Sequence, residues 1–253
     1  MSGATEHWLQ SPALAPYRTA MLAGMALSAW MWWRRTRHQP RLFLIWVGAL
    51  GGVFVGAKLA YLFSEAATDW ARPDRWLRLA TGKSILGGLL GGWAGVEIAK
   101  ALAGYRRSTG DRFAVIAPLA VGIGRIGCCL HGCCQGRIVA RSTWCTVTDP
   151  AGQPRWPSAQ WELAFQIVAA VFFSAALRAG WWRDRLFFLY LAAYGLFRML
   201  HEPLRDTPTL IGDWSGYRIL GALCVLLGTG LFARRTARMK RLPSPTDGND
   251  VTP

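Results

Sequence analysis

Long apolar stretches fill most of this sequence, and clusters of charged residues separate them. A helix that crosses a bilayer needs roughly 20 predominantly apolar residues. Seven stretches of about that length can be drawn, at residues 12–33, 42–63, 84–103, 113–130, 158–177, 186–200 and 216–233. The pattern therefore predicts an all-α polytopic membrane protein in which seven transmembrane helices form one bundle.

The composition supports a membrane location and removes one other class of function. The chain has 253 residues, 52% of them hydrophobic, and its 28 Gly lie mainly within apolar runs. A soluble domain rarely has this composition. A net charge of +15 in a soluble protein would suggest a nucleic-acid partner, but here the basic residues lie mainly at the ends of the predicted spans. We therefore expect no nucleic acid to bind.

The distribution of arginine predicts how the bundle is oriented. Basic groups at residues 34–41, 106–112, 178–185 and 234–241 fall on one side if the spans alternate. Cytoplasmic loops carry such an excess, so we expect the amino terminus outside and the carboxyl terminus in the cytoplasm. Residues 1–17 contain Glu6 and no basic run, so we expect the first span to be retained. Residues 1–241 then form one membrane domain, and the polar residues 242–253 a disordered cytoplasmic tail.

Small residues indicate which helices touch. Because lipid provides no hydrophobic drive for helix association, close backbone approach at Gly must supply the contact. The second and third predicted spans are rich in Gly: Gly48, Gly51, Gly52, Gly56, Gly87, Gly88, Gly91, Gly92 and Gly95. We expect these two spans to pack centrally.

Several charged residues fall within or at the edges of the spans, where they are costly and mark polar interiors or substrate paths. Arg125 lies in the fourth span, Glu162 in the fifth and Arg198 in the sixth. Arg205 follows Arg198 by about two helical turns, so both can face one cavity, with Glu202 between them. Guanidinium groups bind phosphate with two hydrogen bonds, which favours recognition of an anionic phospholipid headgroup. The alternative is an Arg–Glu network that only ties helices together.

Four of the six cysteines fall in one short segment. Cys128, Cys129, Cys133 and Cys134 surround His131 within residues 124–137. Such a group can bind a soft metal, form disulfides in an oxidising compartment, or provide a nucleophilic thiolate near Arg125. It can also be ordinary packing, since Cys is a small apolar residue in buried helices.

Three motifs resemble the prolipoprotein diacylglyceryl transferase family, and the likeness extends from about the second span to the seventh. Residues 124–137 begin and end with Gly-Arg, as the family signature does. Residues 194–198, followed by Glu202 and Arg205, resemble the family's conserved segment near the last span. Residues 157–162 resemble its Pro-Ser-Gln-Leu-Tyr-Glu, and residues 87–89 resemble the end of its His-Gly-Gly-Leu.

The resemblance implies a bacterial inner-membrane enzyme, monomeric and without a cofactor. It would move the diacylglyceryl group of phosphatidylglycerol to a lipobox Cys thiol, releasing glycerol phosphate. Arg125 and Arg198 match essential arginines, Arg205 a supporting one, and Glu202 the acid between them. The other candidate substrate contacts are Gly87, Gly88, Glu162, Arg137 and Cys128.

The sequence departs from the family at positions that matter for acid–base chemistry. The family His falls at Leu86, and the signature Asn and Glu positions hold Cys128, His131 and Cys133. We expect His131 or a Cys133 thiolate to act as the base in place of the family His. The Cys-His segment is then expected to lie beside the reacting centre. The acceptor is then a lipobox thiol, another acceptor protein or a small-molecule thiol.

A second hypothesis takes the same scaffold for a different purpose. In it, Cys128, Cys129, Cys133, Cys134 and His131 serve thiol redox chemistry or bind a soft metal such as copper or zinc. A transporter is less favoured, because the seven spans show no internal repeat.

Overall fold

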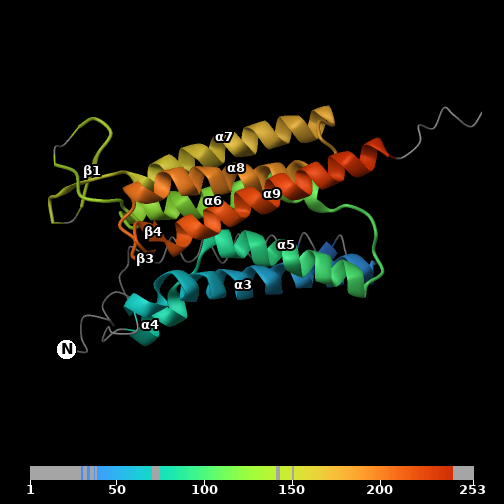
Figure 1. The fold of residues 1–253 in the computed structure, drawn as a ribbon, viewed down its shortest axis with the longest axis horizontal. Coiled ribbons are helices and arrows are strands. Elements are labelled where there is room, and N and C mark those ends of the chain that lie inside the picture. The colour runs from blue at the N-terminus through green and yellow to red at the C-terminus, as the bar shows by residue number, and fades with distance from the viewer. Residues whose placement is uncertain are drawn as a thin grey trace, which may run out of the picture.

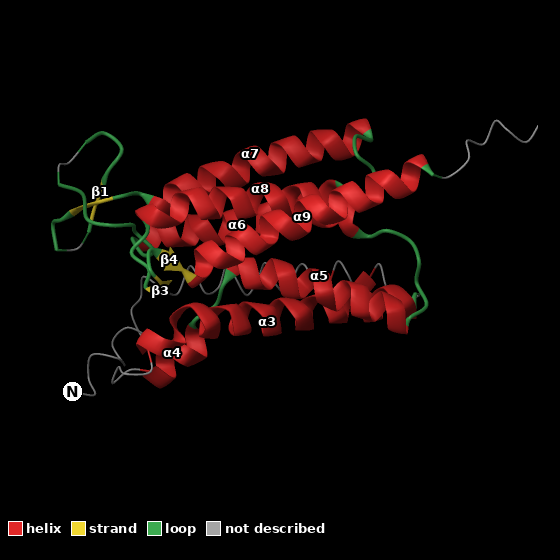
Figure 2. Ribbon diagram, viewed as in Figure 1, coloured by secondary structure: helices red, strands yellow, loops and turns green. Residues whose placement is uncertain are grey.

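The computed structural model describes residues 30, 33–34, 37, 39–69, 75–140, 143–149 and 151–241. The predicted first span lies almost wholly outside these residues, as does the predicted tail. Seven numbered helices make up most of the described chain (Figures 1 and 2): α3 Pro40–Asp69, α4 Arg75–Thr81, α5 Ile85–Leu102, α6 Gly110–His131, α7 Ser158–Ala179, α8 Leu186–His201 and α9 Gly216–Lys240. Each of the later predicted spans coincides with one of them, α3 and α9 running further than expected.

The helices are those of a polytopic membrane protein. Within the described residues, five are long and apolar enough to cross a bilayer: Pro40–Glu65 of α3, α5, α6, α7 and α9. Helix α8 has 16 residues, which is short of a full span. Large apolar side chains face outward; Phe54, Val171 and Leu226 expose 65%, 67% and 70% of their surface. Water would penalise this surface, whereas lipid chains would cover it at no cost.

The helices form two groups that lie side by side along their length (Figure 1). Helices α3 and α5 pack as an antiparallel pair, and α6, α7, α8 and α9 form the second group, with α9 touching both. Glycine makes the α3–α5 contact possible, as expected, but among the described helices the pair lies at one side rather than at the centre. A Cβ at Gly52 or Gly56 would collide with backbone atoms of α5, at Gly91 in the first case and Gly87 in the second.

The apolar core lies in the second group and against the start of α5. Tyr190, Leu191 and Tyr194 of α8 are fully buried, and Phe173 of α7 packs on the same cluster. Cys224 of α9 is also fully buried and packs within this core.

One end of the bundle carries the irregular structure. There β1 (Val147–Thr148) pairs with β2 (Pro154–Arg155), and β3 (Thr209–Ile211) pairs with β4 (Trp214–Ser215). Helices α3, α6 and α8 end here, and α5, α7 and α9 begin here (Figure 1). An isolated bridge between Gly136 and Arg205 joins the loop after α6 to the loop after α8. The side chains of six helix ends are therefore gathered in one place.

Candidate active site

Glu162, near the start of α7, lies at the centre of a buried charge cluster. Its Oε2 lies 2.8 Å from Arg125 Nη2 and 3.1 Å from Arg198 Nη1. Arg205 Nη1 is 3.7 Å from the same oxygen. The other oxygen, Oε1, accepts a hydrogen bond of 2.6 Å from the Tyr194 hydroxyl. Three of the arginines named as candidates from sequence alone thus converge on one carboxylate.

A second carboxylate, that of Glu202, supports the cluster from the end of α8. Its Oε2 accepts a hydrogen bond of 2.7 Å from Arg198 Nη2, while Arg205 Nε is 3.8 Å away. Its Oε1 accepts hydrogen bonds from the hydroxyls of Thr207 (2.9 Å) and Ser215 (3.4 Å). Glu202 therefore fixes the orientation of the Arg198 guanidinium and links it to the start of α9.

Arg205 reaches the cluster by a different route from the one predicted. Helix α8 ends at His201, and Glu202–Leu204 forms a single 3-10 turn that includes Pro203. Proline has no backbone N–H to continue the α-helical bonding. Arg205 then has extended backbone (φ −94°, ψ 155°). Its side chain meets Arg198's partners because the chain turns back, not because the two arginines share a helix face.

The cluster is buried and holds more positive than negative charge. Arg125, Glu162, Arg198 and Glu202 each expose less than a tenth of their surface. Three guanidinium groups face two carboxylates, since arginine stays charged even when buried. Among the described residues, the Nε atoms of Arg125 and Arg198, and Nε and Nη1 of Arg205, have no hydrogen-bond partner. Unpaired buried donors are rare and costly, and a phosphate is the kind of group that would satisfy them.

Two tyrosines belong to this end of the bundle and were not singled out from sequence. Tyr194 is the hydroxyl donor to Glu162, and Tyr217 donates a hydrogen bond of 2.6 Å to Glu65 Oε1. The Arg198 guanidinium carbon lies 5.8 Å from the centre of the Tyr217 ring. Tyr217 thereby connects the charge cluster to α3.

His201 was also missed as a site residue. It is buried at the end of α8, and its ring stacks on Phe197 at 5.1 Å between centroids. Trp156 Nε1 donates a hydrogen bond of 3.0 Å to His201 Nε2, which assigns the ring proton of the neutral imidazole to Nδ1. The sequence does not predict this hydrogen bond, because Trp156 lies in the loop before α7, 45 residues from His201.

Three thiols lie together beside Arg125. The Sγ atoms of Cys128, Cys133 and Cys134 are all within 4.8 Å of one another, and Cys129 and His131 are outside this group. Arg125 Nη1 is 3.8 Å from Cys128 Sγ. The pKa of the Cys134 thiol is lowered, chiefly because it accepts hydrogen bonds from the other two thiols, and Arg125 and Arg205 act in the same direction. All six cysteines are free thiols.

The remaining predicted residues support the site from outside the charge cluster. Arg137 is exposed, and its Nε donates a hydrogen bond of 3.3 Å to the Arg205 carbonyl. Gly87 and Gly88 lie where α5 packs on α3. Leu86, where the resemblance would place a histidine, is 1% exposed within the apolar core.

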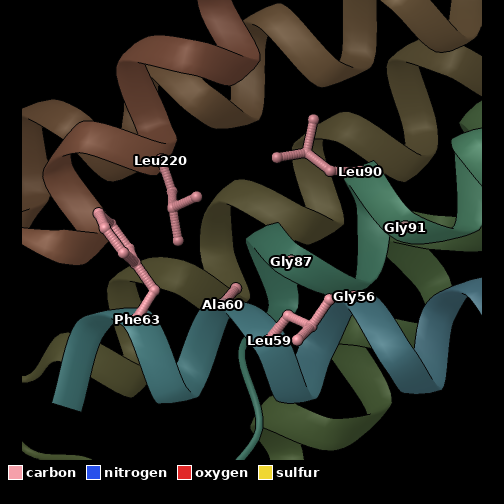
Figure 3. Close-up of a pocket in the computed structure, with 8 residues that line it drawn as sticks. All are labelled: Gly56, Leu59, Ala60, Phe63, Gly87, Leu90, Gly91 and Leu220. Atoms are coloured by element: carbon pink, nitrogen blue, oxygen red, sulfur yellow. The ribbon is translucent and has the colours of Figure 1, made fainter. Parts of the chain in front are cut away.

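An apolar cavity of about 250 Å³ opens between α3, α5 and α9. Four large apolar side chains line it: Leu59 and Phe63 of α3, Leu90 of α5 and Leu220 of α9 (Figure 3). Three glycines of the α3–α5 contact also line it: Gly56, Gly87 and Gly91. Leu220 is one helical turn beyond Tyr217, and Phe63 is two residues before Glu65. Along α9 the cavity thus lies one helical turn from Tyr217, whose ring contacts Arg198.

Fold and site together define a class: a polytopic helical membrane protein with a buried, arginine-rich cluster beside an apolar cavity at one end of the bundle. Comparison with known proteins gives the family. The prolipoprotein diacylglyceryl transferase family matches residues 13–234, and the chain belongs to that family.

Relatives named phosphatidylglycerol–prolipoprotein diacylglyceryl transferase resemble the chain along most of its length. The protein of Gluconacetobacter diazotrophicus is 32% identical over 89% of this chain and 86% of its own. The protein of Vibrio vulnificus is 29% identical over 79% of this chain and 76% of its own length. The protein of Shewanella sp. (strain MR-4) is 28% identical over 88% of each chain. These matches confirm the family resemblance seen in the motifs.

Proposed function

We propose that this protein transfers the diacylglyceryl group of phosphatidylglycerol to a cysteine thiol of a prolipoprotein, with release of glycerol phosphate. Family membership and the names of the relatives support this activity. The observation that carries it is the excess of guanidinium over carboxylate groups around Glu162, with buried N–H donors left without partners. An anionic lipid phosphate has the charge and the acceptor oxygens that these donors lack.

Arg125, Arg198 and Arg205 hold the phosphate in this proposal, and Glu162 and Glu202 hold the arginines. The acyl chains extend into lipid and along the apolar cavity that adjoins Tyr217. The acceptor sulfur, as a thiolate that has already lost its proton, attacks the glycerol carbon that bears the phosphate oxygen. The carbon–oxygen bond breaks, and its electron pair leaves with glycerol phosphate. Guanidinium groups fixed beside the phosphate stabilise that charge where it develops.

The arrangement in the membrane is part of the proposal. Seven spans, with the amino terminus outside and the carboxyl terminus in the cytoplasm, put the cluster near the outer face of a bacterial inner membrane. Residues 1–241 form one domain and act as a monomer, with 242–253 as a cytoplasmic tail. The arginine-rich ends at residues 106–112, 178–185 and 234–241 support this orientation. The test is to label single cysteines, introduced at positions 107 and 213 of a variant whose six native cysteines are replaced by serine, with an impermeant maleimide in whole cells; only position 213 should react.

The activity is tested with purified full-length protein in proteoliposomes. Phosphatidylglycerol labelled in its diacylglyceryl group is supplied with a lipobox peptide, and label on the peptide is measured. We expect transfer by the wild type and a loss of about 100-fold or more in Arg125→Ala, as for removal of one charge-stabilising donor. Arg178→Ala is the matched control, because Arg178 is exposed at the far end of α7. Equal activity in the two variants, or none in the wild type, would overturn the proposal.

A further inference from the structure

We propose that Cys128, Cys133 and Cys134 bind one zinc ion, and that its fourth coordination position takes the thiolate of the acceptor. The second half of this inference rests on the transferase function proposed above. The first half is a metal site in its own right and is tested separately.

The geometry of the three sulfurs fits zinc. Their Sγ atoms all lie within 4.8 Å of one another. Zinc–sulfur bonds are about 2.3 Å long, which separates the sulfurs of a tetrahedral site by about 3.8 Å. A shift of about 1 Å or less therefore closes the site around the ion. Cys133 and Cys134 are on the exposed turn after α6, where such a shift is easy. Three protein ligands and one open position are typical of zinc sites that act on substrates.

The backbone brings the thiols together without help from a ligand. Gly132 ends α6 in the left-handed conformation (φ 66°), and Cys133 N–H then donates a hydrogen bond of 3.2 Å to the Cys128 carbonyl. Beyond the thiols, Gly136 is bridged to Arg205, and Arg137 N–H donates to the Leu204 carbonyl at 3.0 Å. The turn is therefore anchored on both sides.

The charge of the surroundings fits as well. A zinc ion with three thiolates carries one net negative charge, and the Arg125 guanidinium lies beside the site. Arg125 Nη1 lies 3.8 Å from Cys128 Sγ, so the ion is within about 6 Å of it once the zinc–sulfur bond is added. The Arg125 guanidinium offsets the charge of the zinc site, and the unpaired N–H groups of Arg198 and Arg205 remain for the phosphate.

The zinc ion promotes deprotonation of the acceptor thiol, which the apolar Leu86 side chain cannot do. An acceptor thiol that binds zinc loses its proton to water and remains a thiolate at neutral pH. Its sulfur electron pair forms the bond to the glycerol carbon while the carbon–oxygen bond to phosphate breaks. The product is an uncharged thioether, a poor ligand that leaves the ion. No oxidation state changes, and Cys128, Cys133 and Cys134 stay bound throughout.

The metal site is tested first on full-length protein purified in detergent from cells supplied with zinc. We expect about one zinc ion per chain by mass spectrometry. Each of three variants should bind zinc much more weakly: Cys128→Ser, Cys133→Ser and Cys134→Ser. The loss should exceed about 100-fold, because loss of a group that only supports a ligand already costs about 10- to 100-fold. Cys129→Ser and Cys145→Ser are the controls, because both thiols lie outside the group, and both should keep the ion. Metal-poor wild type with three freely alkylated thiols, or equal zinc in all five variants, overturns the site.

The role of the ion is tested with cobalt in place of zinc, which needs no folded variant. The thiolate-to-cobalt absorption should intensify when a lipobox peptide with Cys is added, and should not change with the same peptide carrying Ser. An unchanged spectrum with the Cys peptide, or full transfer after zinc removal, rejects the acceptor role and leaves the transferase function standing. Zinc binding and a spectral change without any transfer count against the transferase function and leave the metal site standing.

Discussion

Arg125 Nη2 and Glu162 Oε2 lie 2.8 Å apart, although one residue is near the end of α6 and the other near the start of α7. The long loop between them, with β1 and β2, folds outward so that the two helices can lie side by side. Arg198 and Arg205 approach the same carboxylate from α8 and the loop beyond it. Glu162 therefore links the end of α6, the end of α8 and the loop after α8 to the start of α7.

Replacing Glu162 by Gln should destabilise the protein by about 3–5 kcal/mol, because three guanidinium groups with little exposed surface would lose a shared counter-charge. Equilibrium unfolding by SDS in mixed micelles measures the loss. The control is Asp206→Asn, since Asp206 is 71% exposed in its pair with Arg155, and such a pair contributes about 1 kcal/mol or less. A Glu162→Gln protein as stable as Asp206→Asn would show that the cluster does not hold the helices.

Arg205 should matter more for lipid binding than for stability. Its two ion-pair distances, 3.7 and 3.8 Å, are the longest in the cluster, and its Nε and Nη1 lack hydrogen-bond partners within the described residues. Each charge-assisted hydrogen bond to phosphate contributes about 1.5–3 kcal/mol, so Arg205→Gln should weaken phosphatidylglycerol binding at least about tenfold. Quenching of tryptophan fluorescence by brominated phosphatidylglycerol measures the affinity.

Arg178→Gln is the matched control for Arg205→Gln. It removes the same charge, but Arg178 is exposed at the far end of α7, away from the charge cluster. Its affinity for the brominated lipid should stay within about threefold of the wild type, since an exposed charge acts weakly through water. Equal weakening in both variants would mean that general surface charge, not the buried cluster, attracts the lipid.

The sequence predicts the helices well, and the site only in part, for physical reasons. Apolar length is a local property, so α5, α6 and α7 begin and end close to the predicted residues. The cost of a charge in lipid made Arg125 and Arg198 candidates without any structure. That Glu162 is their shared partner depends on how α6, α7 and α8 pack, which no local pattern records.

The same limit applies to the residues that were missed or grouped too broadly. His201 and Tyr217 gain their roles from Trp156 and Glu65, which are distant in sequence. In residues 124–137, the sequence alone indicates five possible metal ligands and does not distinguish among them. Helical phase separates Cys129 from Cys128 by about 100°, because an α-helix has 3.6 residues per turn. The left-handed Gly132 then turns Cys133 back toward Cys128.

Helix α5 should tolerate no side chain at Gly91, although Gly51 on the partner helix α3 tolerates one. A Cβ at Gly91 would collide with the Gly52 carbonyl oxygen, whereas nothing lies within 4 Å of a Cβ at Gly51. Gly91→Ala forces the two backbones apart and should cost about 1–3 kcal/mol, as overpacking does. Gly51→Ala should be neutral or slightly stabilising. SDS unfolding of both variants decides, and similar stabilities would contradict the close α3–α5 contact.

Tyr194 and Tyr190, one turn apart on α8, should respond differently to loss of the hydroxyl. Tyr194 donates to the Glu162 carboxylate at 2.6 Å, and Tyr190 to the neutral Gln166 amide oxygen at 3.0 Å. A hydrogen bond to a charged group contributes about 1.5–3 kcal/mol, against about 0.5–1.5 kcal/mol for a neutral pair. Tyr194→Phe should therefore lose about twice as much unfolding free energy as Tyr190→Phe. It should also lower transferase activity, because Glu162 would be less firmly oriented toward the arginines that hold the phosphate. Equal losses of stability with unchanged activity would separate Tyr194 from the site and leave it as a core residue like Tyr190.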